Sequence, residues 1–305
     1  MKIAFIVQCH KNPQQLNILF KQLQNFDCDI YVHIDKNSEN IDSQLDSFSN
    51  LFIIPFEERV KVGWGDISQV NATLKLIDLV LDSGHEYNYV WLISGQDFPI
   101  KSATEISRFL EINKGTAFID IKPTNNRRYE RLLKRNLVLH TAWLTKKGFI
   151  RRIVRNVWYM ITGGRYKTFN FFRRKIDSDI FYFGSSWWCL PFQAIIQMKQ
   201  ALVDNPDFHR FYKHCHCPDE SFFQTLLMNH TSFNDKIRSN LVFIDWTGCK
   251  DSPRILMSKY YDEYLSLWGG ESNYMFARKF DFSVDKDIIY KIQKMIDNEA
   301  LIQND

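Results

Sequence analysis

A strand–helix–strand pattern at the start of the chain limits the fold more than any other feature. Residues 2–7 form a short apolar run, residues 16–23 carry apolar side chains at helical spacing, and residues 29–35 form a second apolar run. This order predicts a βαβ unit and therefore a parallel sheet. Ligands bind beyond the carboxyl ends of parallel strands. The residues that we expect around such a crevice are Gln8, Cys9, His10, Asp35 and Lys36.

The loop 62–68 is the second candidate for a ligand contact. Gly63 and Gly65 flank Trp64 directly before a predicted helix. Glycines let a backbone approach a ligand closely, and the indole ring offers a stacking face. Asp35 could accept hydrogen bonds from a ribose or a base at the same crevice, or it could simply begin a turn. No GxGxxG or GxxxxGK[ST] pattern occurs, which disfavours dinucleotide oxidoreductases and P-loop enzymes.

The stretch 215–227 carries the best candidate for a catalytic base. Pro218, Asp219 and Glu220 stand before an apolar run at helical spacing. Proline and acidic residues both suit the first turn of a helix, so we expect one helix to begin at Pro218. The apolar run would anchor this helix and hold Glu220 at a cavity edge, where a general base must lie. Alternatively, the two carboxylates only cap the helix.

Two further segments place candidate side chains near the crevice. Residues 89–94 predict a central buried strand, and Asp97 follows in a glycine–proline turn, where a site carboxylate is plausible. Trp187 and Trp188 are adjacent. Since neighbouring residues on a strand face opposite ways, one ring should pack inside while the other lines a cavity.

Composition changes sharply in the segment 127–175. Fifteen of its residues are Lys or Arg, Glu130 is its only acid, and aromatic residues are interleaved with the cations. Such a segment can bind phosphates, single-stranded nucleic acid or an anionic membrane surface. Alternatively, it is a solvated basic face on helices whose aromatic side chains pack inward. A nucleic-acid-binding or anionic-membrane-binding protein that uses this segment is therefore our alternative function, although the net charge of +4 is modest.

Targeting and metal signals are weak. The N-terminus lacks a cleavage pattern, and no apolar run reaches the roughly 20 residues that span a bilayer, so we expect a soluble or peripheral cytoplasmic protein with reduced thiols. His214, Cys215, His216 and Cys217 are consecutive, but a second Cys/His pair, which structural zinc sites usually bring from elsewhere in the chain, is missing. We therefore expect no metal site there.

Seven motifs together resemble the core-2/I-branching glycosyltransferase family, which also contains the peptide O-xylosyltransferases. The resemblance runs in order along most of the chain and departs from the animal enzymes in lacking an anchor and stem and in its basic central segment. The motifs are Gln8 to Lys11, Val32 to Lys36, Trp64-Gly65, Ser94 to Pro99, Gly184 to Trp188, Pro218 to Glu220 and Phe276 to Phe280.

The resemblance implies an α/β fold of the GT-A type, a Rossmann-like mixed sheet flanked by helices. It implies one catalytic domain over residues 1–305, with a nucleotide-sugar half (1–125), a basic aromatic helical insert (126–176) and an acceptor half (177–305). It also implies inverting transfer from a UDP-sugar without a divalent metal or other cofactor. Glu220 matches the family base, and Asp97 is the next choice should Glu220 be structural.

The resemblance assigns the remaining residues by motif. Lys279 matches the lysine that neutralises the leaving diphosphate, while Arg254 and Arg278 are looser matches. Asp27-Cys28-Asp29 spells Asp-x-Asp but precedes the second strand, so we discount it as a metal site. The donor contacts expected from the crevice and the motifs are Gln8, His10, Asp35, Lys36, Trp64, Gly65, Arg254, Arg278 and Lys279. The acceptor contacts expected are Asp97, Trp187 and Trp246.

The expected biology follows from this class. The donor sugar would be N-acetylglucosamine or xylose, and the acceptor a free or lipid-linked saccharide. We expect a bacterial cytoplasmic enzyme of surface polysaccharide synthesis that makes peripheral contact with anionic lipid at the inner face of the plasma membrane.

Overall fold

The structure is a computed structural model of the whole chain. It describes residues 1–38, 41–122, 129, 132–133, 136–137, 149–161, 180–249, 252–269 and 272–302. Most of the basic segment 127–175 therefore lies outside the described residues. Among its described aromatic side chains, Tyr129 packs against Phe183 whereas Phe149 is 70% exposed, so the prediction that they pack inward holds only in part.

A mixed sheet forms the centre of the molecule. Its seven strands have the order β3-β2-β1-β4-β7-β6-β8. β1 pairs in parallel with β2 and β4, and β2 pairs in parallel with β3, so the predicted βαβ unit is confirmed. The bounds of these strands are β1 Ile3–Cys9, β2 Cys28–Ile34, β3 Leu51–Ile53 and β4 Tyr89–Ser94.

The second half of the sheet reverses direction. β7 (Trp188–Pro191) is antiparallel to both β4 and β6 (Ala117–Ile119), and β6 is parallel to β8 (Ile237–Arg238). β1 and β4 are buried along their whole length or nearly so, because central strands of an α/β sheet are covered on both faces. The expected Rossmann-like mixed sheet is therefore confirmed.

A smaller sheet of three strands joins the C-terminal part of the chain to the turn after β4. β10 (Phe276–Arg278) lies between β5 (Asp97–Pro99) and β9 (Val242–Ile244), antiparallel to the first and parallel to the second. In this register Arg278 lies opposite Asp97. Strand pairing thus brings a C-terminal cation beside a carboxylate of the N-terminal half.

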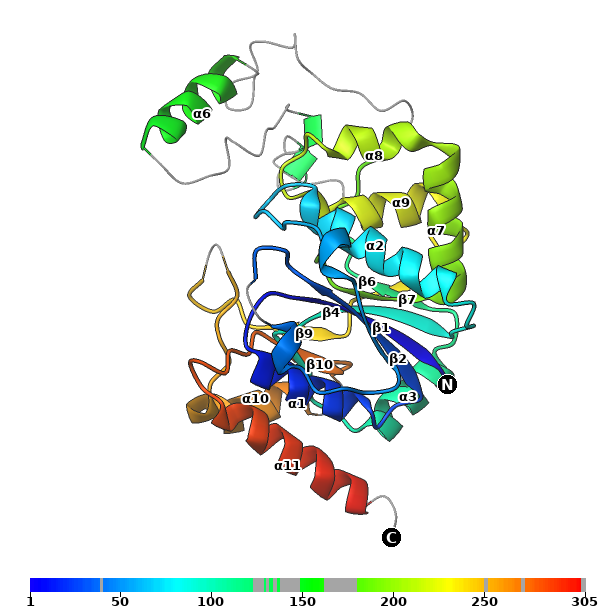
Figure 1. Cartoon of the computed structure of the whole chain (residues 1–305), viewed down its shortest axis with the longest axis vertical. Helices are drawn as coiled ribbons and strands as arrows, with labels where there is room; N and C mark the ends of the chain where they lie inside the picture. Colours follow the sequence, from blue (N-terminus) through cyan, green and yellow to red (C-terminus); the bar gives the residue numbers. More distant parts are fainter. Residues whose placement is uncertain are drawn as a thin grey trace.

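Helices cover both faces of the central sheet (Figure 1). α1, α3, α10 and α11 lie on one side, and α2, α7, α8 and α9 lie on the other. Their bounds are α1 Pro13–Leu23, α2 Ser68–Asp82, α3 Ala103–Ile112, α7 Phe192–Asp204, α8 Pro206–Tyr212, α9 Phe222–His230, α10 Tyr261–Trp268 and α11 Asp287–Ile302. The remaining described helix, α6 (Phe149–Ile161), stands at the edge of the molecule, away from the sheets.

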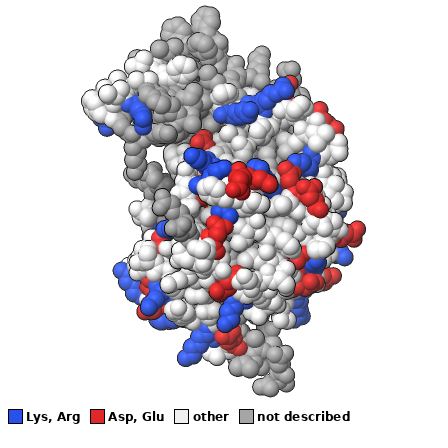
Figure 2. All heavy atoms as spheres, in the orientation of Figure 1, with Lys and Arg blue, Asp and Glu red and all other residues white. Residues whose placement is uncertain are grey.

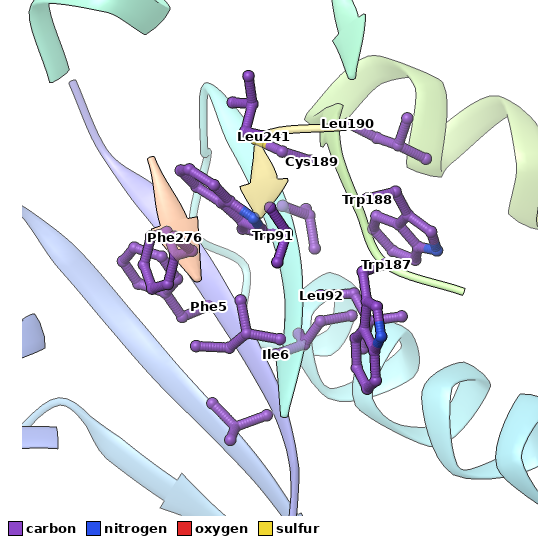
Figure 3. Close-up of a cluster of buried hydrophobic side chains, with 14 of the residues drawn as sticks. Phe5, Ile6, Trp91, Leu92, Trp187, Trp188, Cys189, Leu190, Leu241 and Phe276 are labelled. Atoms are coloured by element: carbon purple, nitrogen blue, oxygen red, sulfur yellow. The ribbon is translucent and has the colours of Figure 1, made fainter. Parts of the chain in front are cut away.

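Large aromatic side chains fill the space between the two sheets (Figure 3). The rings of Phe5 and Trp91 stack at 5.8 Å, and Phe276 of the small sheet approaches Trp91 to 4.7 Å. Trp188 is fully buried next to Phe223 of α9. Each fully buried side chain of this size stabilises the fold by about 1.5–3 kcal/mol. This core fixes the loops that follow β1, β4 and β10.

Candidate active site

One cavity of about 880 Å³ opens at the carboxyl ends of β1, β2 and β4, where the sequence placed the crevice. Its wall combines the ends of these parallel strands with β9, β10 and the turn before α9. The predicted site residues that line it are Gln8, His10, Asp35, Trp64, Trp187, Glu220, Trp246, Arg278 and Lys279. Residues far apart in the sequence are thus gathered in one place.

Glu220 lies on a tight turn that a buried helix holds in place. Residues Pro218–Glu220 form a separate 3₁₀ turn, and Ser221, with φ −144°, interrupts it before α9 begins at Phe222. The expectation that one continuous helix begins at Pro218 is therefore wrong, because Ser221 separates the 3₁₀ turn from α9. Phe222, Phe223, Leu226 and Leu227 are buried as predicted. The apolar face of α9 fixes this turn at the cavity wall.

The turn before β7 clamps the Glu220 turn from the other side. The Gly184 N–H donates to the Glu220 carbonyl at 2.9 Å, and the Ser186 hydroxyl donates to Asp219 Oδ2 at 2.6 Å. Gln224 of α9 donates to the Ser185 carbonyl at 2.6 Å. Asp219 and Glu220 both border the cavity, and the carboxylate of Asp219 is bound to Ser186. Three carboxylates, Asp120, Asp219 and Glu220, make this part of the wall acidic.

Cationic side chains lie at the end of β10 and directly after it. Arg278 is 8% exposed; its Nε lies 3.3 Å from Asp97 Oδ1, and its guanidinium stacks on the Trp187 ring at 4.1 Å. Burial lowers the pKa of Lys279, and the neighbouring cations Arg278 and Lys11 lower it further. Among the described residues, no carboxylate lies within ion-pair distance of Lys279. A half-buried ammonium beside a guanidinium is a ready site for an anion.

At the ends of β1 and β2, the crevice is formed by side chains that make hydrogen bonds within the protein. Asp35 Oδ1 accepts hydrogen bonds from the backbone N–H groups of Asn37 and Val62 at 3.0 and 3.1 Å, which ties β2 to the loop that carries Trp64. Gln8 donates to Thr73 at 2.6 Å. Burial lowers the pKa of His10, so its ring is neutral and offers both a donor and an acceptor. The Trp64 side chain is 68% exposed, and its ring lies 5.7 Å from that of His216 in an edge-to-face arrangement.

Four predicted contacts do not line the cavity. Lys36 turns away and donates to the Glu57 carbonyl at 2.9 Å. Gly65 has φ +73° and uses its carbonyl to accept from the Cys217 N–H, so it shapes the loop. Arg254 stacks on the Tyr260 ring at 4.1 Å and pairs with Asp245. Asp97 is 1% exposed beneath Arg278.

Asp97 therefore fits neither of its predicted roles, acceptor contact and second choice for the catalytic base. Its carboxylate accepts from the Ser94 N–H and hydroxyl, each at 2.8 Å, and pairs with Arg278. A buried carboxylate that is bound on all sides cannot take a proton from an acceptor hydroxyl in the cavity. The structure assigns it to the support of Arg278.

Several cavity residues were missed by the sequence reasoning. Asp120 follows β6 and accepts from the Asn240 N–H and side-chain amide at 3.0 and 2.8 Å. Lys11 pairs with Asp281 at 2.5 Å beside Lys279. Asp120 could have been found, because it is a carboxylate directly after a short apolar run, residues 117–119. Asn240 and Tyr274 carry no such signal.

The metal candidates behave as separate structural groups. Asp29 of the Asp-x-Asp sequence pairs with Lys2 at 2.8 Å at the start of β2, outside the cavity wall. Cys215 is buried, and His216 Nδ1 lies 2.8 Å from Cys217 Sγ. In the part of the chain that the structure describes, no group of three or more His, Cys, Asp or Glu side chains could hold a metal ion. The same part contains no helix that is long and apolar enough to cross a membrane.

In this mixed α/β fold, one crevice joins a candidate base, Glu220, to a pair of cations, Arg278 and Lys279. A family model described as Core-2/I-Branching enzyme matches residues 3–265. The chain therefore belongs to the Core-2/I-branching enzyme family, and its fold is the expected mixed α/β sheet flanked by helices.

Its relatives include xylosyltransferases of animals. Xylosyltransferase oxt of Drosophila pseudoobscura pseudoobscura is 22% identical over 327 residues, which cover 97% of this chain and 33% of that protein. Xylosyltransferase 1 of Homo sapiens is 24% identical over 313 residues, which cover 95% of this chain and 30% of that protein. The chain thus spans about a third of the length of these relatives.

The likeness to solved structures is weak. The galactosyltransferase LgtC, solved with donor and acceptor sugar analogs, has 11% identity and a TM-score of 0.40, covering 92% of this chain and 87% of its own. Mouse xyloside xylosyltransferase 1 has 10% identity and a TM-score of 0.35, covering 91% of this chain and 97% of its own.

Proposed function

We propose that the chain transfers a sugar, xylose or N-acetylglucosamine, from a UDP-sugar to a hydroxyl of a saccharide acceptor, with inversion and without a divalent metal. One observation carries the proposal: Glu220 and the cation pair Arg278 and Lys279 line the same cavity. A proton acceptor and an anion site in one crevice are what an in-line displacement of a diphosphate requires. The names of the animal relatives favour xylose.

The proposed reaction is a single displacement. The Glu220 carboxylate takes the proton of the acceptor hydroxyl while that oxygen forms a bond to the anomeric carbon. The bond between the anomeric carbon and the diphosphate oxygen breaks on the opposite face, and UDP leaves with the electron pair. Inversion follows because attack and departure occur on opposite faces of the sugar.

The cations have the task that a metal ion has in other transferases. Negative charge grows on the diphosphate as it leaves, and preorganised cations stabilise that charge most in a site that excludes water. Arg278 is held rigidly between Asp97 and Trp187, so it loses little freedom when it binds the diphosphate. Lys279 is available beside it.

The remaining wall residues divide between donor and acceptor. His10, Asp35 and Trp64 border the end where the parallel strands stop, which suits a uridine. Trp246, which is 51% exposed, and Trp187 offer ring faces to an acceptor sugar. We further propose a cytoplasmic role in bacterial surface polysaccharide synthesis with a lipid-linked acceptor. The density of cations in residues 127–175 supports this, because such acceptors reside at anionic membranes.

Release of UDP from a panel of UDP-sugars in the presence of EDTA tests the proposal. We expect one donor to turn over, and Glu220→Gln to slow it by roughly 100-fold to 10,000-fold, the usual contribution of a general base. UDP affinity, measured by calorimetry, should be unchanged in this variant. Glu111→Gln, an exposed acid on α3, is the matched control.

Each other outcome is informative. Turnover that EDTA abolishes and manganese restores would overturn metal independence alone. Full activity of Glu220→Gln would overturn its role as the base. Failure to bind UDP at all would overturn the assignment of the cavity to a UDP-sugar.

A further inference from the structure

The helix α6 carries an apolar face that the part of the chain described by the structure leaves exposed. Phe149 and Ile150 are 70% and 72% exposed, and Ile153 is 47% exposed. Val154 and Val157 are exposed as well. These five positions lie at i, i+1, i+4, i+5 and i+8, which places them on one side of the helix. Buried contacts of the fold therefore do not explain this apolar stripe.

The other side of α6 is basic. Arg151 and Arg152 lie outside the apolar stripe, and the helix contains no acidic residue. The guanidinium of Arg152 lies 5.6 Å from the centre of the Phe149 ring, at the border between the two sides. Figure 2 shows mainly uncharged atoms with a small basic group at the outer edge, where Figure 1 places α6. A helix that is apolar on one side and basic on the other is typical of the membrane interface.

The chemistry of the surroundings distinguishes between possible occupants. Residues 127–175 contain fifteen Lys or Arg residues and a single acid, so the segment complements an anionic surface. A nucleic acid would use these cations but would gain nothing from an aliphatic stripe. A second copy of the chain would bring two strongly basic segments together. Of these three occupants, the anionic bilayer alone matches both sides of the helix.

We propose that α6 binds an anionic membrane, with its apolar stripe at the boundary between headgroups and acyl chains. The helix has 13 residues, so it is about 20 Å long and lies in the interface without spanning the roughly 30 Å core. Arg151 and Arg152 then reach phosphates at the headgroup level. The rest of the protein remains in water. This binding does not depend on the transfer reaction, and it is measured without donor or acceptor.

Co-sedimentation of the full chain with vesicles tests this proposal. Vesicles of phosphatidylcholine alone are compared with vesicles that contain phosphatidylglycerol in addition. We expect pelleting with the anionic vesicles only, and the double variant Ile150→Ser, Ile153→Ser should lower the partition coefficient by at least about tenfold, since interfacial binding scales with buried apolar area. Ile112→Ser, an equally exposed isoleucine on α3, is the control and should pellet like the native chain.

Charge and apolar contact are then separated. The double variant Arg151→Gln, Arg152→Gln should bind anionic vesicles more weakly than the native chain. Its remaining electrostatic attraction should fall as the salt concentration rises, because salt screens exposed charges. Equal pelleting with neutral and anionic vesicles, or unchanged binding of the isoleucine variant, would overturn the proposal. Binding of a single-stranded oligonucleotide without any binding to vesicles would also overturn it. So would a dimer, detected by light scattering, that dissociates in the isoleucine variant while vesicles fail to pellet the native chain.

Discussion

Arg278 and Asp97 form a buried ion pair beneath the cavity wall, with Arg278 Nε 3.3 Å from Asp97 Oδ1. The pairing of β10 with β5 sets these residues opposite each other, and the Trp187 ring covers the outer face of the guanidinium. Burial raises the pKa of Asp97 and lowers that of Arg278, and each partner opposes the shift of the other. The pair therefore holds a cation rigidly at the place where the proposed diphosphate leaves.

A double-mutant cycle tests whether the two residues act as a unit. Removal of one partner from a buried ion pair costs about 3–5 kcal/mol of unfolding free energy, because the other charge is left uncompensated. We expect losses of this order for Asp97→Asn and for Arg278→Gln, measured by chemical denaturation. The double variant should lose about 2–3 kcal/mol less than the sum of the single losses, the coupling found for residues in contact.

The control for this cycle is Asp285→Asn. Asp285 accepts from the N–H and hydroxyl of Ser258, away from the cavity wall. Its loss should add to that of Arg278→Gln within about 0.5 kcal/mol, as expected for independent sites. Strict additivity of Asp97→Asn with Arg278→Gln would show that Asp97 does not support the guanidinium.

We expect the proposed UDP binding to weaken at alkaline pH, because Lys279 then loses its proton. Its pKa is lowered, so it loses its proton at a lower pH than an ordinary lysine. UDP affinity should therefore fall as the pH rises through the lowered pKa of Lys279. At neutral pH, Lys279→Met should weaken UDP binding about 10-fold to 100-fold, which corresponds to the loss of one charge-assisted hydrogen bond of about 1.5–3 kcal/mol.

Two variants make this prediction specific. Lys279→Arg keeps its charge at every pH that the fold tolerates, so the alkaline fall should disappear. Lys36→Met removes a lysine that binds the Glu57 carbonyl outside the cavity wall, and calorimetry should detect no change in UDP affinity. A native affinity that stays flat to high pH, or a strong effect of Lys36→Met, would contradict the placement of the diphosphate beside Lys279.

The sequence predicted the crevice correctly because its signals are local. Apolar runs and helical spacing located β1, α1, β2 and β4, and a parallel sheet gathers their carboxyl ends by geometry alone. The alternation of side chains predicted that one of the two adjacent tryptophans packs inside while the other lines a cavity. In the structure Trp188 is fully buried and Trp187 borders the cavity. Such inferences need no knowledge of distant contacts.

The errors concern partners that are distant in the chain. Asp97 has every local sign of a site carboxylate, but the β5–β10 register covers it with Arg278. Arg254 resembles a diphosphate ligand by motif, yet Tyr260 offers its guanidinium a ring at 4.1 Å. Neither Arg278 nor Tyr260 can be placed from local periodicity, because pairing across a sheet and stacking across a loop are tertiary choices.

His33 links the stability of the sheet to pH. Its Nε2 accepts from the Val60 N–H at 2.9 Å, and burial lowers its pKa from 6.5 to about 4. The unfolded chain takes up a proton below pH 6.5, whereas the folded chain does so only near pH 4, so stability is lost as the pH falls between these values. Because one pKa unit corresponds to about 1.4 kcal/mol, this loss should reach about 3 kcal/mol.

Denaturation curves recorded at several pH values between 7 and 4 check the effect of His33. His33→Gln keeps an acceptor for Val60 but does not titrate, so its unfolding free energy should fall less steeply over this window than that of the native chain. His214→Gln, an exposed histidine, is the control and should leave the slope unchanged. An identical slope for His33→Gln and the native chain would rule out His33 as the source.

Gly184 connects the packing of the wall to the position of Glu220. A Cβ atom at this residue would lie 1.7 Å from the Asp120 carbonyl oxygen, a backbone atom that cannot move alone. Gly184→Ala should therefore destabilise the fold by about 1–3 kcal/mol, as overpacking does. Because the Gly184 N–H donates to the Glu220 carbonyl, the forced shift should also displace the base and lower kcat while UDP affinity changes little. Gly84→Ala, which meets no atom within 4 Å but strains a residue at φ +69°, should lower stability without any loss of kcat.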